Sequence, residues 1–396
     1  MRRTKMRNGK LVGVGAMAIG LVVGFAGKVF SADAGTGNTP CMAVLDQFAG
    51  APELGPGEEA VAPTKASTQP SSAPENLPGK GLAEHPMIYV GEGYNKMFVV
   101  NDGKVIWTYQ TGKGNEYDDV WMLSNGNVLF TRMAYIAEVT PKKEVVWRYD
   151  ANMSPDDPTK HTEIHACQPI GLDRVLFVEN GLPPKLKIVN IKTKTVEVEH
   201  DLDYLQPANP KTIHPQFRRV RMTAAGTYLV PYLNMGRVVE YDKDFKEIWS
   251  FPDVAIPATA PANATRPATG FILPSGERFS PWAAIRLKNG NTLITNESGK
   301  SQMEVSPEKK IVWQLKPEDL PAEWRYPNTQ TCTRLGNGNT IVCSTGRGGK
   351  GPQLVEVTPE KKVVWVLWDW KELGPATAVQ VLDDPGVPEV PGDSGH

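Results

Sequence analysis

Three segments of the sequence closely repeat one another, and this repeat limits the folds that the chain can adopt. They are VWMLSNGNVLF…AEVTPKKEVVW (120–147), AIRLKNGNTLI…MEVSPEKKIVW (284–313) and CTRLGNGNTIV…VEVTPEKKVVW (332–365). Each contains an alternating strand, an Asn-Gly turn, a second strand, a third strand ending in Glu-Val, a Pro-Lys turn and a fourth strand ending in Trp. Four antiparallel strands per repeat form one blade of a β-propeller.

The turn between the first two strands of each repeat is an Asn-Gly pair, at residues 125–126, 289–290 and 337–338. Asn-Gly strongly favours a two-residue type I′ hairpin, because both central positions of that turn need a positive φ. A two-residue turn at 337–338 would place Cys332 directly opposite Cys343. By this register the two cysteines form a hydrogen-bonded pair, whose spacing is wide for a disulfide.

Weaker copies of the repeat fill the rest of the domain. Residues 218–249 keep the closing tryptophan, and residues 165–198 replace it with valine. Residues 87–107 supply the last three strands of another unit, and residues 376–383 supply its first. We therefore predict an all-β protein with a six-bladed β-propeller over residues 87–384. Its blades are four-stranded and antiparallel, and N- and C-terminal strands close the ring by sharing one blade.

Two residue types recur once per unit, and we expect them to build the ring. A large flat side chain at the end of each fourth strand fills the wedge between neighbouring blades, and a glutamate recurs in the third strand. These residues are Trp107, Trp147, Trp249, Trp313 and Trp365, with Glu138, Glu240, Glu304 and Glu356. Function is therefore expected where the period is broken.

The first 34 residues (1–34) have the order of a secretory signal, with basic residues, an apolar run from Leu11 to about Ala26, and small residues. We expect cleavage near Ala32 or Ala34, with an uncleaved N-terminal anchor as the alternative. Either outcome predicts a periplasmic or secreted protein. No other apolar run is long enough to span a membrane, so we expect membrane contact only through this segment.

The composition of the flanking segments predicts disorder. Residues 35–86 are rich in Pro, Ala, Gly, Ser and Glu, which predicts a disordered tether, and residues 385–396 read as a shorter disordered tail. Export predicts an oxidising compartment, in which the four cysteines are able to pair. Removing residues 1–32 takes away six basic residues and no acidic one, so the formal charge falls from −1 to −7. A negative surface without a basic stripe argues against a nucleic-acid partner.

Polar residues interrupt the repeat on one face of the predicted ring. In a propeller, the segments that enter the first strands gather around one mouth of the central channel. His161, His165 and His214 lie in the entry segments of two adjacent blades, with Glu163 midway between the first two and Arg218 after the third. Alternate residues of a strand share a face, so the three polar groups of the His-x-Glu-x-His motif are expected to point the same way.

Three interpretations of this cluster stay open. His161, Glu163 and His165 can hold a divalent metal, with His214 as a fourth ligand. Alternatively His161, Glu163, His165, His214 and Arg218 perform acid–base or nucleophilic catalysis. The third interpretation gives these polar residues a structural role only.

Other segments of the same face supply candidate substrate-binding residues, which are Asp119, Trp282, Gln330 and Arg347. Long polar and basic side chains at a channel mouth suit an anionic ligand such as a sulfate, a carboxylate or an acidic sugar. Residues 252–281 form an insertion that either caps the channel or is a solvated loop.

The repeat NGNTLI…EVxPEKKVVW resembles that of the bacterial arylsulfotransferase-like β-propellers. More loosely it resembles the pyrroloquinoline-quinone (PQQ) type repeats, whose Asp-x-x-x-Gly-Lys-x-x-Trp turn is similar to NDGKVIW at 101–107. The likeness covers residues 87–384. The first resemblance implies a periplasmic six-bladed enzyme with a channel histidine as sulfate-accepting nucleophile beside other His and Arg residues. Quinoprotein dehydrogenases usually have eight blades, so six blades argue against PQQ as the cofactor.

We therefore expect an enzyme that acts on an anionic or sugar-like small molecule. Its reaction would be sulfuryl transfer with a histidine nucleophile, which makes it a transferase. The alternatives are a metal-assisted hydrolase or lyase and His/Glu acid–base chemistry. A hypothesis from another class is a non-catalytic propeller that binds a glycan or a protein.

Overall fold

The computed structural model describes residues 39–55, 58, 72–91, 95–111, 116–154, 157, 159–206, 208–253 and 271–396. The expected signal or anchor at residues 1–34 and most of the insertion at 252–281 lie outside these residues. Among the described helices, none has the length and apolar character needed to cross a membrane.

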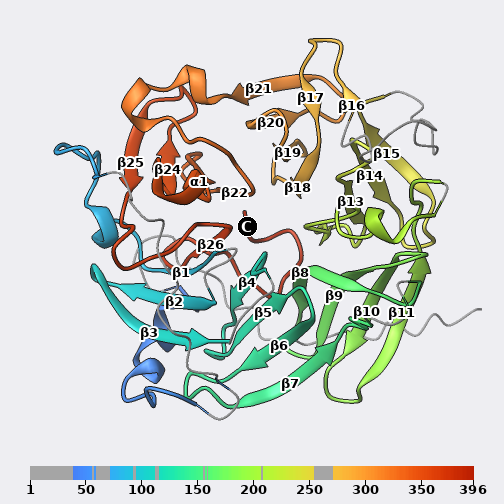
Figure 1. Cartoon of the computed structure of the whole chain (residues 1–396), viewed down its shortest axis with the longest axis horizontal. Coiled ribbons are helices and arrows are strands. Elements are labelled where there is room, and N and C mark those ends of the chain that lie inside the picture. The colour runs from blue at the N-terminus through green and yellow to red at the C-terminus, as the bar shows by residue number, and fades with distance from the viewer. Residues whose placement is uncertain are drawn as a thin grey trace, which may run out of the picture. The chain divides into compact units, whose positions relative to one another are not determined.

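Six four-stranded antiparallel sheets surround a central channel (Figure 1). The strands of each sheet are given from the channel outward (Figure 1). Three sheets are β26 (Ala378–Val381), β1 (Met87–Val90), β2 (Lys96–Asn101), β3 (Lys104–Gln110); β4 (Val120–Met122), β5 (Val128–Arg132), β6 (Tyr135–Val139), β7 (Val145–Asp150); and β8 (Glu163–Ile170), β9 (Arg174–Asn180), β10 (Lys185–Asn190), β11 (Thr195–Asp201).

The other three sheets complete the ring in chain order. They are β12 (Arg221–Met222), β13 (Tyr228–Tyr232), β14 (Arg237–Tyr241), β15 (Glu247–Phe251); β18 (Pro281–Arg286), β19 (Thr292–Asn296), β20 (Ser301–Val305), β21 (Ile311–Leu315); and β22 (Cys332–Arg334), β23 (Thr340–Cys343), β24 (Leu354–Val357), β25 (Val363–Leu367). The predicted six-bladed β-propeller with four-stranded antiparallel blades is confirmed.

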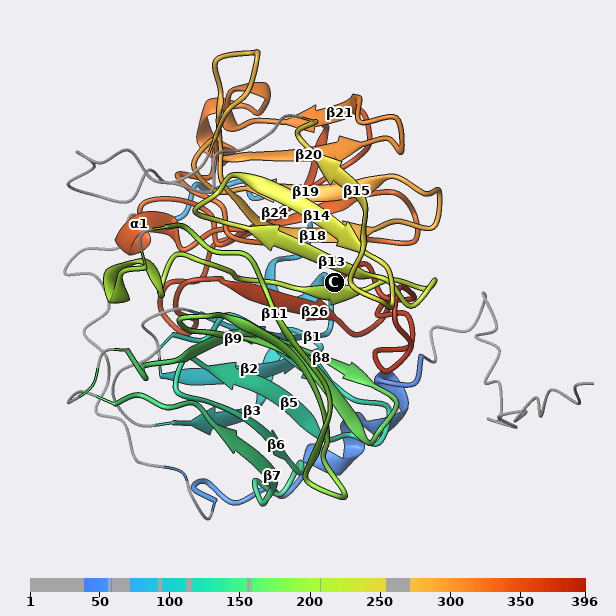
Figure 2. The same cartoon turned by 90° about the vertical axis from the view of Figure 1, so that its right-hand side faces the viewer.

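Short elements decorate the ring. They are the hairpin of β16 (Phe271–Ile272) and β17 (Arg278–Phe279), the 3-10 helices η1 (Met42–Phe48), η2 (Gly81–Ala83), η3 (Pro210–Thr212), η4 (Pro317–Asp319) and η5 (Ala322–Trp324), and the single-turn helix α1 (Gly346–Gly349). In the side view, α1 lies on one face of the ring and the C-terminal segment on the other (Figure 2).

One sheet combines strands from distant parts of the chain. Strand β26 pairs antiparallel with β1, with Ala378 opposite Val90 and Val381 opposite Met87. Strands from the two segments that we predicted to share a blade, residues 87–107 and 376–383, therefore lie in one sheet. Its three outer strands precede all other blades in the sequence, and its innermost strand follows them.

The Asn-Gly turns differ from the two-residue type I′ turns expected from the sequence. In the first repeat, Gly126 has a φ of 89° and Asn125 is not among the residues with positive φ. The Leu123 N–H donates to the Asn127 carbonyl at 2.8 Å, so residues 124–126 form a three-residue loop. The Asn125 side chain accepts a bond from the Asn127 N–H at 2.9 Å, which stabilises the turn without a positive φ at asparagine.

The longer turn moves the cysteines out of register. Cys332 pairs with Val342 rather than with Cys343, and Cys343 faces Leu354 of the next strand. All four cysteines of the sequence are described, and each is buried as a free thiol. The disulfide bonds that an oxidising compartment would allow are therefore not present in this structure.

The recurring tryptophans join neighbouring blades, as expected from their period. The indole N–H groups of Trp107, Trp249 and Trp313 each donate to a proline carbonyl in the Pro-Lys turn of the following blade. These donor–acceptor distances are 2.9, 3.0 and 2.8 Å, to Pro141, Pro307 and Pro359 respectively. The indole thus fills the seam and satisfies its one polar group.

The recurring glutamates also have a structural role. Glu138 and Glu356 accept bonds from Asn127 and Asn339, each at 2.6 Å. Each asparagine follows the Asn-Gly pair of the same blade, so the glutamate ties the third strand to the first hairpin. Glu304 is bonded to both asparagines of its own repeat in the same way.

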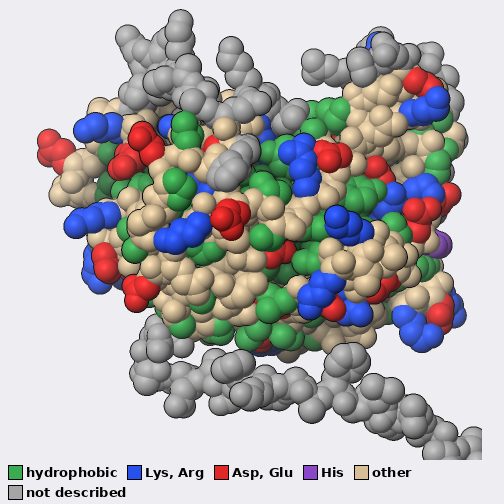
Figure 3. Space-filling model, turned by 90° about the horizontal axis from the view of Figure 1, so that it is seen from below, with side chains coloured by type: hydrophobic (Ala, Val, Ile, Leu, Met, Phe, Trp, Pro, Cys, Tyr) green, Lys and Arg blue, Asp and Glu red, His purple; other side chains and the backbone are tan. Residues whose placement is uncertain are grey.

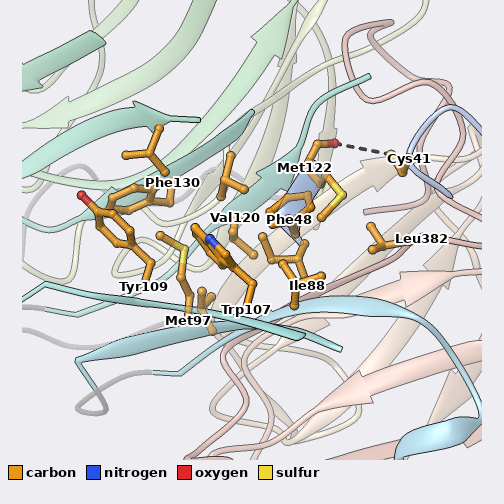
Figure 4. Close-up of a cluster of buried hydrophobic side chains, with 14 of the residues drawn as sticks. Cys41, Phe48, Ile88, Met97, Trp107, Tyr109, Val120, Met122, Phe130 and Leu382 are labelled. Carbon is orange, nitrogen blue, oxygen red and sulfur yellow. Dashed lines mark hydrogen bonds between the residues drawn. The ribbon is translucent and has the colours of Figure 1, made fainter. Parts of the chain in front are cut away.

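The predicted tether is wrong for its described parts. Helix η1 packs onto the seam between the β26–β3 and β4–β7 sheets, where Cys41, Val44, Leu45 and Phe48 are buried (Figure 4). These four residues recur at the spacing of one helical face. Phe48 packs edge to face on Trp107, with ring centroids 5.4 Å apart. The described N-terminal residues are therefore part of the folded domain.

The segment expected to be a disordered tail is also ordered. Within residues 385–396, Glu389 and His396 are 6% and 2% exposed. The Gly171 N–H donates to the Glu389 carbonyl at 2.9 Å, and the Arg334 N–H donates to the Gly395 carbonyl at 3.0 Å. The segment packs against blades on two sides of the channel.

Charged side chains of both signs are mixed on the face of the molecule drawn in Figure 3. Neither the basic nor the acidic residues visible there form a single continuous patch. A surface potential of one sign attracts a highly charged macromolecule of the opposite sign. The mixed charges on this face do not create such a potential.

Replacing Phe48 with alanine tests the packing of the N-terminal segment. Phe48 is 1% exposed, so Phe48→Ala should lower the free energy of unfolding by about 3–5 kcal/mol. Urea unfolding measures the change, with Leu54→Ala as a control because Leu54 is 45% exposed and should change stability by less than about 0.5 kcal/mol. Equal effects of the two substitutions would contradict this packing.

His85 makes the stability of the ring depend on pH. It donates to Glu356 at 3.0 Å and to Asp383 at 3.2 Å. Burial alone would lower the pKa of His85, but the bonds to Asp383 and Glu356 raise it to about 9. The folded-state pKa lies above the unfolded value, so the stabilisation is complete below pH 6.5 and is lost as pH rises through about 9.

We expect the wild type to exceed His85→Gln in stability at pH 6, and this difference to shrink at pH 9.5 by on the order of 1 kcal/mol after solvent screening. Chemical unfolding at the two pH values measures it. A difference that is constant or grows with pH would show that the His85 contacts do not stabilise the fold.

Candidate active site at the channel mouth

The segments entering the first strands of three successive blades bring polar residues together at one mouth of the channel. Asp118 precedes β4, Glu163 and His165 begin β8, and His214 and Arg218 precede β12. The predicted cluster from two blades is therefore assembled in space, and a third blade joins it through Asp118.

Glu163 is the centre of the cluster and accepts bonds from three histidines. Its Oε2 atom lies 3.1 Å from His165 Nε2 and 2.8 Å from His214 Nδ1, and its Oε1 atom lies 2.9 Å from His161 Nε2. Burial would raise the pKa of Glu163, but the bonds from His165 and His214 hold it well below its usual range. Glu163 is therefore an anion that orients three imidazole rings.

His165 is held between two carboxylates. It is 1% exposed, and its Nδ1 lies 2.7 Å from Asp118 Oδ2 while its Nε2 faces Glu163. Burial and the positive charge of Arg218 would each lower the pKa of His165, but the bonds to the two carboxylates outweigh them and raise it. Both ring nitrogens can therefore donate, as in an imidazolium.

His214 lies between an anion and a cation. Its Nδ1 faces Glu163, and its Nε2 lies 3.1 Å from the Arg218 Nη2 and 3.6 Å from Glu116 Oε1, so the Arg218 contact is the shorter of the two. A guanidinium has no acceptor atom, so Nε2 must accept this bond and Nδ1 must carry the proton that goes to Glu163. The side chain of His214 is 45% exposed, which makes it the accessible member of the pair that it forms with His165.

Arg218 is fixed by its surroundings. It is 4% exposed, donates to the Phe217 carbonyl at 3.0 Å and has its guanidinium 4.7 Å from the ring centre of Trp282. Among the described residues, the Nε of Arg218 and the Nε1 of Trp282 have no hydrogen-bond partner. Arg218 and the Trp282 ring that stacks on it thus each keep one buried, unused donor.

Two overlapping groups of side chains are close enough to hold a metal ion. Glu163, His165 and His214 form one group, and Glu116, Asp118 and His165 form the other, with ligand atoms within 4.8 Å of one another in each. His161, expected as a ligand from the sequence, belongs to neither. In the first group His214 would have to release the Nδ1 proton, while Arg218 occupies its other nitrogen.

Asp119 does not face the mouth as expected for a substrate-binding residue. It is fully buried and lies 3.1 Å from Arg219, 2.9 Å from Arg221 and 3.4 Å from His396. Burial would raise the pKa of Asp119, but Arg219 and Arg221 hold it far below its usual value. Its described contacts make it a buried counter-ion.

The remaining predicted binding residues differ in their placement. Trp282 stacks on Arg218 and so belongs to the cluster. Gln330 is 6% exposed at the entry to β22, where its N–H donates to the Cys343 carbonyl at 3.3 Å. The side chain of Arg347 lies outside the described residues. The binding roles of these residues stay predictions.

Sequence reasoning missed Asp118 and the buried set of Arg219, Arg221 and His396. Asp118 occupies the same entry position in its blade as Glu163 and His165 do in theirs, so the repeat could have found it. His396 had no local signal, because its partners lie more than 170 residues away in the sequence.

Comparisons with known proteins support the fold. No family model and no curated protein matches the chain. A Bacteroides caccae protein of unknown function is similar in structure, with 22% identity, a TM-score of 0.58, and coverage of 74% of this chain and 97% of that one.

Two lyases are more distant structural neighbours. An inactive virginiamycin B lyase from Staphylococcus aureus with quinupristin has 14% identity, a TM-score of 0.46 and coverage of 76% and 91%. A streptogramin B lyase has 14% identity, a TM-score of 0.44 and coverage of 72% and 84%. The strand order of the chain itself defines the class as a β-propeller. The neighbours do not show the arylsulfotransferase-like or PQQ-like assignment.

Asp119→Asn should lower the free energy of unfolding by about 3–5 kcal/mol, because it leaves Arg219 and Arg221 buried without their counter-charge. Guanidinium unfolding measures this loss. Asp150→Asn is the control, since Asp150 pairs with Arg148 at a site where its side chain is 62% exposed, and it should cost less than about 1 kcal/mol. A small loss for Asp119→Asn would mean that the arginines do not depend on this carboxylate.

Proposed function

We propose that the protein is an exported enzyme that acts on an anionic or sugar-like small molecule at the channel mouth. The observation that carries this proposal is the position of His214 between Glu163 and Arg218. Export to the periplasm or the exterior rests on the signal-like order of residues 1–34.

The arrangement prepares the Nε2 atom of His214 to act as a base or a nucleophile. Glu163 accepts the Nδ1–H bond and thereby fixes the tautomer and the ring, as a carboxylate does in a catalytic carboxylate–histidine pair. In the structure this lone pair accepts the bond from Arg218 Nη2, so the proposed attack requires Arg218 to release Nε2 and to bind the anion instead. An anion bound by Arg218 would lie beside this lone pair.

Sulfuryl transfer from an aryl sulfate fits this geometry. The Nε2 lone pair forms a bond to sulfur, the ester S–O bond breaks, and the leaving phenolate oxygen keeps the electron pair and takes a proton from water. An acceptor hydroxyl then attacks sulfur and gives its proton to water, and the N–S bond breaks with its electron pair returning to His214 Nε2. Arg218 stabilises negative charge on the sulfuryl oxygens.

Aryl-sulfate turnover in the presence of a phenol acceptor tests this function. His214→Ala should lower kcat/KM by about 100-fold or more, the scale of a positioned acid–base or nucleophilic group. His200→Ala is the matched control, because His200 stacks on Phe245 outside the cluster and should leave turnover unchanged.

Three results would redirect the proposal. Equal activity of His214→Ala and the wild type would remove His214 from the mechanism. Activity that is lost with a chelator and restored by a divalent cation would replace this mechanism with the metal-assisted one. If the wild type turns over no sulfate ester, phosphate ester or glycoside but binds a glycan or a protein, it is a binding propeller instead.

A further inference from the structure

Segment 383–396 crosses the face of the ring opposite α1 and ends at the channel (Figures 1 and 2). It contacts hairpins of several blades. The contacts are Ser124 N–H to Glu389 Oε1 at 2.6 Å, Gly171 N–H to the Glu389 carbonyl, Lys288 to Asp393 at 3.0 Å and Arg334 N–H to the Gly395 carbonyl. The segment therefore covers the channel mouth opposite the histidine cluster.

His396 inserts its side chain into the channel. Its Nε2 lies 3.0 Å from the Val120 carbonyl and 3.4 Å from Asp119 Oδ1. Its ring packs edge-on against Trp121 with centroids 4.6 Å apart. The His396 carbonyl accepts a bond from Arg221 Nε at 3.3 Å. Residue 396 is thus the most deeply seated part of the segment, at 2% exposure.

Parts of the segment are packed less tightly than His396, although Glu389 and Ser394 are also buried. A pocket of about 260 Å³ separates part of it from the hairpins of the β18–β21 and β22–β25 sheets. The Lys288 side chain of its ion pair is 76% exposed, and an exposed pair contributes little. Val390 is 50% exposed and so adds little apolar burial.

The surroundings of His396 favour its uncharged form. Burial lowers the pKa of His396 to about 4, Arg219 and Arg221 act in the same direction, and Asp119 opposes them. The Nδ1 atom of His396 has no hydrogen-bond partner among the described residues. A proton at Nδ1 would add a third positive charge beside the two arginines, which destabilises the seated position.

We propose that segment 383–396 is a displaceable stopper of the channel and that His396 seats it. With the stopper in place, a small molecule reaches the histidine cluster only from the other mouth. Arg219 also donates to the Asp118 carbonyl at 3.2 and 3.3 Å, so unseating His396 changes the contacts next to the carboxylate that holds His165. This inference does not depend on the reaction proposed above.

Hydrogen exchange on the full chain tests the stopper. In the wild type, the amides of Gly171 and Arg334, which donate to the segment, should exchange through a local opening at a rate at least 10-fold above that of the central-strand amides. If these two amides exchange only through global unfolding, the segment is not displaceable and the proposal is overturned. This arm needs no variant.

A substitution tests the seat itself. His396→Ala should speed exchange at Gly171 and Arg334 by about 10-fold. His396→Asn keeps a donor for the Val120 carbonyl and should lie between His396→Ala and the wild type. His200→Ala is the control and should match the wild type. Unchanged exchange in His396→Ala would show that His396 does not seat the segment.

Discussion

The seam between neighbouring blades is the contact on which the ring depends. Each sheet has to bury its faces against the next, and at three seams the tryptophan that closes a blade meets the proline turn of the following one. The Trp107 indole both packs against Phe48 and donates to the Pro141 carbonyl. Trp365 satisfies its indole N–H on the Gly81 carbonyl instead, so the N-terminal segment supplies the partner at that seam.

This ring gathers its irregular segments around the channel and leaves a polar column there. Glu163 and Asp118 surround His165 at one mouth, and Asp119, the next residue in the segment that enters β4, pairs with two arginines. Buried charges are tolerated only where each has a partner. Arg219 links the two groups, because it pairs with Asp119 and also donates to the Asp118 carbonyl.

The sequence predicted those parts of the structure that local periodicity encodes. Alternating strands, the seam tryptophans and the glutamate links follow from the repeat, and the position of His161 and His165 at a strand entry follows from the blade register. The turn geometry was mispredicted, because the Asn125 side chain stabilises a three-residue loop that only Gly126 enters with a positive φ. The turn signal alone does not distinguish these loops.

The described parts of the two flanking segments were mispredicted for another physical reason. Composition describes only the average tendency of a segment to fold. The segment as a whole is rich in proline and glycine, so its composition did not indicate the short apolar face of Met42–Phe48. Residues 385–396 are held by isolated hydrogen bonds and an ion pair to residues of several blades that are distant in the sequence. No local sequence pattern predicts such contacts. The same limit applies to the Asp119 network, where the partners come from different parts of the chain.

The central claim is that Glu163 and Arg218 prepare His214 for catalysis by fixing its tautomer. Nitrogen-15 NMR of the imidazole rings at pH 7 tests this most directly, with His214 assigned through its alanine variant. The structure predicts a protonated Nδ1 and an unprotonated Nε2 for His214, and loss of this preference in Glu163→Gln. A ring protonated at Nε2 in the wild type would contradict the arrangement and the function inferred from it.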